Sequence, residues 1–140
     1  MNTDRIASAA ALIGRIALAS LFLISGFGKL AAPAATKAYI VSAGLPLPDL
    51  SYLAAVIVEV GFGIALVLGF KARPVAAVMA LFSLATALAF HTDFADQSQF
   101  INFLKNVSIA GGLLQVIAFG AGAWSLDALR RGPARRAALA

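Results

Sequence analysis

The sequence predicts an all-α integral membrane protein built as a four-helix bundle. Of its 140 residues, 61% are hydrophobic and only 12% are charged, and its mean hydropathy is +0.93. A soluble domain has about half apolar and about a quarter charged residues, and so small a globule cannot bury such an excess. Four apolar segments also have roughly the 20 residues needed to cross a hydrocarbon core of about 30 Å. Together these observations predict a multi-pass membrane protein.

The first expected span covers about residues 6–30. Its beginning has features of a cleavable signal peptide, namely Arg5, an apolar run and the small-residue stretch AAPAA. We expect a retained helix instead, because Arg15 lies too deep for a signal peptide's apolar region and Lys29 interrupts the run. Gly26 and Gly28 predict that a neighbouring helix approaches closely near its end.

The other expected spans cover about residues 50–70, 74–91 and 100–123, and a basic tail follows over residues 124–140. Glycine and prolines at positions 44, 46 and 48 break the chain before the second span. Only three residues link the second and third spans, which predicts a tight antiparallel hairpin. Pro74 suits a first helical turn, where its missing N–H has no cost. We expect one membrane domain over residues 1–140.

The placement of basic residues predicts that both termini are cytoplasmic. An even number of spans puts both termini on one side, and cytoplasmic loops carry an excess of Lys and Arg. Three basic residues fall on the opposite side, namely Lys29, Lys37 and Lys105. Seven fall on the side of the termini: Arg5, Lys71, Arg73, Arg130, Arg131, Arg135 and Arg136. Trp124 and the arginines after it are typical of an interfacial anchor on anionic lipid.

Two opposite charges share a depth inside the expected spans. Ionisable groups within a membrane are costly and usually face a partner or a cavity. From the helical rise, Arg15 lies roughly 14 Å and Glu59 roughly 16 Å from the cytoplasmic ends of their helices. An Arg15–Glu59 ion pair is therefore expected. Such a pair either fixes helix packing or marks a carboxylate that binds a ligand or carries a proton.

A second polar group is expected near the opposite membrane surface. Lys29, His91, Lys105 and Asn106 lie at similar levels on three different spans. They could converge on one pocket, with Glu59 or His91 as proton carrier and Lys29 or Lys105 holding an anionic oxygen. The alternatives are a lysine that extends to the headgroups and an ordinary interfacial histidine.

Other chemistries have little support in the sequence. There is no cysteine and one histidine, too few ligands for zinc or haem iron, so we expect no metal. The stretch GFGKL lacks the first glycine and the spacing of a phosphate-binding loop. The basic tail has no interleaved aromatic residues, so we expect no nucleic-acid partner. Redox chemistry would need a borrowed cofactor or a partner.

The chain resembles the DoxX family of small bacterial four-helix membrane proteins. The resemblance rests on GRIALASLFLISGFGKL, IVEVGFGIALVLGFKARP, FH and FLKNVSIAGGLL in this order. These segments contain Arg15, Gly26, Lys29, Glu59, Gly69, Arg73, His91, Lys105, Asn106, Gly111 and Gly112. The resemblance implies a multi-pass protein of the bacterial inner membrane. Members of the family that the chain resembles include a small subunit of a thiosulfate:quinone oxidoreductase and proteins linked to oxidative-stress defence.

Three functions follow as hypotheses, and the residues do not decide whether the chain itself is catalytic. The first is a membrane subunit of a quinone-linked or redox-stress oxidoreductase system, with quinone as a non-covalent ligand. The candidate ligand-binding residues are Arg15, Lys29, Glu59, His91, Lys105 and Asn106. The second is a non-catalytic scaffold or assembly factor, and the third is a small-solute carrier. The expected partners are the lipid bilayer, oxidoreductase subunits and further copies of the chain.

Overall fold

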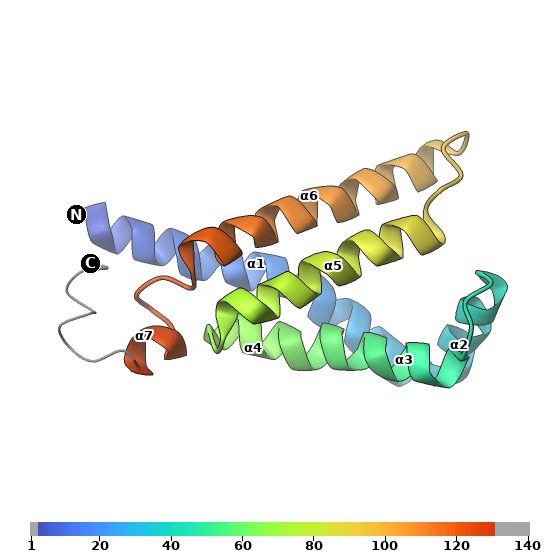
Figure 1. Ribbon diagram of the computed structural model, residues 1–140, viewed down its shortest axis with the longest axis horizontal. Coiled ribbons are helices and arrows are strands. Elements are labelled where there is room, and N and C mark those ends of the chain that lie inside the picture. The colour runs from blue at the N-terminus through green and yellow to red at the C-terminus, as the bar shows by residue number, and fades with distance from the viewer. Residues whose placement is uncertain (1–2, 131–140) are drawn as a thin grey trace.

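The computed structural model describes residues 3–130 and is entirely helical in its regular structure there (Figure 1). Four stretches are long and apolar enough to cross a membrane, which confirms the predicted fold class. They are α1 (Thr3–Ala31), the joined segments α3 (Pro48–Val56), η1 (Ile57–Phe62) and α4 (Gly63–Leu68), then α5 (Ala72–Phe90) and α6 (Gln97–Phe119). Two short helices complete the described chain, α2 (Pro33–Ser42) and α7 (Leu126–Arg130).

The bundle has two distinct ends, which we call the α2 end and the α7 end. The start of α1 lies at the same end as α7, whereas α2 and the α5–α6 connector lie at the other (Figure 1). The chain passes between the two ends four times, once in each long stretch. The cytoplasmic location of the α7 end stays a prediction, and Arg131, Arg135 and Arg136 lie outside the described residues.

The second span is one helix interrupted by a π-helical segment. η1 has the sequence IVEVGF, and the backbone at both of its boundaries keeps right-handed helical angles. The chain therefore continues without a break from α3 through η1 into α4. A π turn is wider than an α turn, and such turns occur frequently at functional sites. In this protein the π segment contains the buried carboxylate Glu59.

Small side chains let α5 and α6 pack closely. On α5, Ala72, Ala76 and Ala80 are buried along one face. They belong to a continuous apolar core with Leu113 and other residues of α6 and with Ala19 of α1. In a membrane, helices associate through close packing rather than through the hydrophobic effect. The Ala76–Ala80 pair thus contributes two small side chains to this helix packing.

Gly26 brings α1 against η1. A Cβ atom built at Gly26 would lie 2.6 Å from Cγ2 of Val60 and 2.9 Å from Cβ of Glu59. Only a glycine permits this approach of the two backbones. Gly28, in contrast, is exposed, and a Cβ there would have nothing within 4 Å. The expectation of a close contact is correct for Gly26 and wrong for Gly28, because Gly28 points away from the neighbouring helix.

We expect Gly26→Ala to destabilise the protein and Gly28→Ala to leave it intact. The methyl group at position 26 overlaps η1, and overpacking of this kind costs about 1–3 kcal/mol. At position 28 the same methyl meets open space and improves helix propensity by up to about 1 kcal/mol. Unfolding of both variants in SDS micelles measures the difference. Equal stabilities would contradict the close contact of Gly26 with η1.

At the α7 end, the side chain of Asp127 joins α7 to the start of α5. Its two carboxylate oxygens accept hydrogen bonds from the backbone N–H groups of Lys71 and Ala72, each at 2.8 Å. These N–H groups belong to the start of α5, which has no helical partner for them. The backbone N–H of Asp127 also donates to the carbonyl of Gly69 at 2.9 Å. α7 is thereby fastened beneath the α4–α5 hairpin.

At the α2 end, an exposed ion pair joins α2 to the start of α3. Nζ of Lys37 lies 2.6 Å from Oδ1 of Asp49. The side-chain hydrogen bond to Asp49 raises the pKa of Lys37 above its usual value. The lysine is therefore charged at neutral pH, and the pair contributes little because both partners are solvent-exposed.

Candidate functional site

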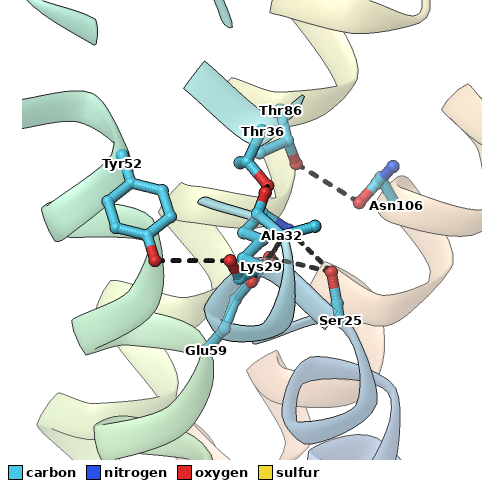
Figure 2. Close-up of polar contacts among 8 residues, drawn as sticks. All are labelled: Ser25, Lys29, Ala32, Thr36, Tyr52, Glu59, Thr86 and Asn106. Carbon is cyan, nitrogen blue, oxygen red and sulfur yellow. Dashed lines mark hydrogen bonds and ion pairs between the residues drawn. The ribbon is translucent and has the colours of Figure 1, made fainter. Parts of the chain in front are cut away.

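The candidate site is a buried ion pair between Lys29 and Glu59. Glu59 lies eleven residues into the 21-residue span and is only 5% exposed. Nζ of Lys29 lies 2.9 Å from Oε2 of Glu59 and donates a hydrogen bond of 2.9 Å to Oε1. Figure 2 shows the two side chains meeting between α1 and η1. The pair thus places two charges together inside the membrane-spanning part of the bundle.

Ser25 completes a three-membered network with the ion pair. Its hydroxyl donates to Oε1 of Glu59 at 3.2 Å and accepts from Nζ of Lys29 at 2.8 Å. The backbone carbonyl of Lys29 accepts a hydrogen bond of 3.3 Å from the hydroxyl of Tyr52, which ties α3 to the end of α1 (Figure 2). Three helical segments therefore hold the lysine in place.

The two carboxylate oxygens of Glu59 have different surroundings. Oε1 accepts from both Ser25 and Lys29, whereas buried Oε2 accepts no well-aligned hydrogen bond from the described residues despite its short distance to Nζ. The Lys29 side chain is 25% exposed, so its ammonium group lies at the edge of the buried region. Within the described part of the chain, Oε2 is therefore held by the charge of the ammonium group alone, and the lysine has access to the surroundings.

The expected Arg15–Glu59 pair is wrong. Arg15 is 1% exposed and directs its guanidinium to backbone carbonyls. Nη1 donates to the carbonyls of Leu66 and Val67 at 2.9 and 2.7 Å, and Nη2 donates to the carbonyl of Trp124 at 2.6 Å. Arg15 thus joins α1 to the end of α4 and to the segment before α7.

The direction of helical side chains explains this difference. Side chains in an α-helix lean toward the N-terminus of their own helix. Arg15 therefore extends toward the α7 end and Lys29 extends back into the bundle, whereas Glu59, on an antiparallel helix, extends toward the α2 end. The opposite leans separate the charged groups of Arg15 and Glu59 although their Cα atoms lie at similar depths. The same leans bring Lys29 and Glu59 toward each other.

The other predicted site residues have separate partners. Nδ1 of His91 lies 2.7 Å from Oε1 of Gln99, within the α5–α6 connector region. The amide of Asn106 accepts from the hydroxyl of Thr86 at 3.4 Å and donates to the carbonyl of Asn102 at 3.1 Å. Within residues 3–130, no hydrogen bond or ion pair joins His91 or Asn106 to Lys29, so a single pocket shared by these residues stays a prediction.

Lys105 lies on the outside of the bundle. Its side chain is exposed at a shallow groove between α1 and α6, whose other lining residues include Leu21 and Ser108. It does not face the Lys29–Glu59 pair. The lean of helical side chains directs it toward the N-terminal end of α6, which lies at the α2 end. This geometry matches a lysine that extends toward the headgroups.

Several functional partners were missed in the sequence. Ser25 could have been found, because it precedes Lys29 by four residues and so shares its helix face. The Trp124 carbonyl and Asp127 could not have been found. The first bonds to Arg15 and the second to the start of α5, and both contacts depend on how the chain folds back after α6. Among the described residues, no group of three His, Cys, Asp or Glu side chains could hold a metal ion.

Comparison with known proteins identifies the family. The DoxX family matches residues 10–92, which include most of α1 and all of the second span and α5. Inner membrane protein YphA of Escherichia coli is 43% identical over 121 residues, covering 83% of this chain and 86% of that protein. Inner membrane protein YqjF of the same organism is 37% identical over 118 residues, covering 84% and 89%. No solved structure matches the chain significantly. With its four membrane-crossing stretches, the chain is therefore a multi-pass inner membrane protein that belongs to the DoxX family.

Proposed function

We propose that the protein is a membrane subunit of a redox system that binds a quinone at the Lys29–Glu59 pair. The observation that carries this proposal is the buried Oε2 of Glu59, which accepts no well-aligned hydrogen bond although it lies in the middle of a span. Ionisable groups at this depth usually serve a ligand or a proton path. A quinol hydroxyl is a donor that fits this oxygen.

The chain's own residues have distinct roles in this proposal. Lys29 donates to a quinone carbonyl oxygen, because its ammonium is charged and its side chain is 25% exposed. Glu59 holds the proton that a quinol hydroxyl gives up, and Ser25 keeps the carboxylate oriented through Oε1. A bound quinone supplies the two-electron chemistry. The electrons are exchanged with a partner oxidoreductase subunit, because the chain has no cysteine to hold a redox centre.

The experiment measures binding of a short-chain ubiquinone analogue to the detergent-purified protein. We expect the analogue to raise the melting temperature of the wild-type protein, and we expect Glu59→Gln to weaken binding about tenfold or more. Ser25→Ala should give an intermediate effect, since it leaves the ion pair in place. His91→Asn and Lys105→Gln are controls and should bind like wild type. No stabilisation of the wild-type protein, or equal binding by Glu59→Gln, would overturn the proposal.

A second candidate function is a non-catalytic scaffold or assembly factor. The observation that favours it is Arg15, which donates its hydrogen bonds within the described residues to backbone carbonyls. These bonds join helices rather than present a charge. If this function is correct, the Lys29–Glu59 pair serves only helix packing. Replacing both partners by Lys29→Met and Glu59→Gln should then leave capture of partner subunits intact in a folded variant.

A further inference from the structure

A long apolar groove follows the lipid-facing side of the second span at the α7 end. Its volume is about 580 Å³, and it lies between η1–α4 and the start of α5. Lys71 is the only polar side chain in its lining, which otherwise consists of apolar residues and glycine. The lining residues are Ile57, Gly61, Phe62, Ile64, Ala65, Leu68, Phe70, Lys71, Pro74, Val75 and Leu126.

The groove has the length of one membrane leaflet. Its lining runs along the second span from Ile57 to Leu68, a separation of eleven residue steps that extends roughly 16 Å at the helical rise. Half of a hydrocarbon core of about 30 Å is about 15 Å. An acyl chain of one leaflet therefore matches the groove from its deep end to the membrane surface.

Two cationic groups gather around one aromatic ring at the surface end of the groove. Nζ of Lys71 lies 5.9 Å and the guanidinium carbon of Arg130 lies 4.7 Å from the centroid of the Phe70 ring. Lys71 and Arg130 are both exposed. The Phe70 ring thus helps to hold two positive charges at the level where the span ends and phospholipid headgroups begin.

The neighbouring carboxylate does not pair with these cations. Both oxygens of Asp127 accept backbone hydrogen bonds at the start of α5. Among the described residues, the ion pairs are Lys29–Glu59 and Lys37–Asp49, and neither is at the α7 end. Lys71 and Arg130 therefore keep their charges available for an anion outside the chain.

We propose that this groove is a binding site for an anionic phospholipid. One acyl chain lies along the groove from Leu68 toward Ile57, and the phosphate lies between the side chains of Lys71 and Arg130. The apolar lining excludes a polar peptide, and the two cations distinguish an anionic lipid from a neutral one. The site does not depend on quinone binding, because it lies on another face of η1 from Glu59.

The headgroup part of the site is tested by native mass spectrometry of the detergent-purified protein. Phosphatidylglycerol and phosphatidylcholine with identical acyl chains are the probes. We expect tighter retention of phosphatidylglycerol, and about fivefold weaker binding for each of Lys71→Gln and Arg130→Gln. Lys105→Gln removes an equal charge from a different groove and should bind like wild type. Glu59→Gln should also bind like wild type, which separates this test from that of the quinone site.

The acyl-chain part of the site is tested by filling the groove. Gly61 lines it, and a Cβ at this position would meet nothing within 4 Å, so Gly61→Leu should fold and exclude the chain. Gly111→Leu is the matched control, because position 111 is equally open but lies outside the groove. Equal retention of both lipids, full competition by inorganic phosphate alone, or occupation of the groove by a second protein copy would overturn the proposal.

Discussion

Lys29→Met is expected to destabilise the protein far more than Glu59→Gln, although the two residues form one ion pair. Removing Lys29 leaves a carboxylate that is 5% exposed in the middle of a span, and breaking a buried pair in this way costs about 3 kcal/mol or more. Removing the charge of Glu59 leaves a lysine near the end of α1, whose long side chain can turn toward the headgroups. We expect a loss of about 1 kcal/mol for Glu59→Gln, as for one lost hydrogen bond.

The measurement is a double-mutant cycle of reversible unfolding in SDS micelles. The double variant Lys29→Met/Glu59→Gln should be more stable than Lys29→Met alone, because the uncompensated carboxylate is gone. Lys37→Met is the matched control, since it breaks the exposed pair with Asp49 and should change stability little. Strictly additive losses, or a larger loss for Glu59→Gln than for Lys29→Met, would contradict a buried pair with one partner near the membrane surface.

Arg15→Met is expected to produce the second large effect. The substitution removes the donor from three backbone carbonyls, those of Leu66, Val67 and Trp124. The Leu66 carbonyl keeps its hydrogen bond from the N–H of Gly69, so the cost comes from the other two carbonyls. Each buried acceptor left without a partner costs about 1–3 kcal/mol, so the total loss is expected to reach about 3 kcal/mol. Arg15→Lys should recover only part of this, because an ammonium group lacks the planar fork that serves acceptors on two segments at once. Arg73→Met is the control, since exposed Arg73 donates to the single carbonyl of Ala118.

A local readout separates loss of the Arg15 contacts from general unfolding. The chain contains no cysteine, so Leu126→Cys introduces a single thiol on α7 that can be labelled. In an Arg15→Met background, we expect labelling to accelerate about tenfold under conditions where the four spans remain folded. Unchanged labelling would show that α7 is held by Asp127 alone.

The fold class was predictable because lipid imposes a strong constraint on sequence. A span must satisfy its backbone hydrogen bonds internally, so long apolar segments become helices whatever the details of their packing. Each expected span overlaps a helical stretch of the structure, and each helix begins two or three residues earlier than expected. The second, third and fourth stretches end earlier than expected, at Leu68, Phe90 and Phe119. The α2 helix was not predicted, because it lies in the connector between the first two expected spans and its 10 residues are too few to cross a membrane.

The pairing of charges was not predictable from depth alone. Arg15 and Glu59 have similar Cα depths, yet their side chains lean in opposite directions and end at different partners. The same lean brings Lys29, from near the end of α1, to a carboxylate in the middle of the second span. A depth calculated for Cα atoms therefore misplaces the two charged groups relative to each other by up to the length of two long side chains.

The bond between Arg15 and the Trp124 carbonyl also sets an order of events during biogenesis. The two residues are 109 positions apart. At 5–20 residues per second, synthesis reaches Trp124 roughly 5–20 s after Arg15. During this interval Arg15 can bond to the carbonyls of Leu66 and Val67, and the segment after α6 then supplies the third acceptor, the Trp124 carbonyl. A chain truncated before residue 124 therefore keeps the carbonyls of Leu66 and Val67 for Arg15 and lacks the third acceptor.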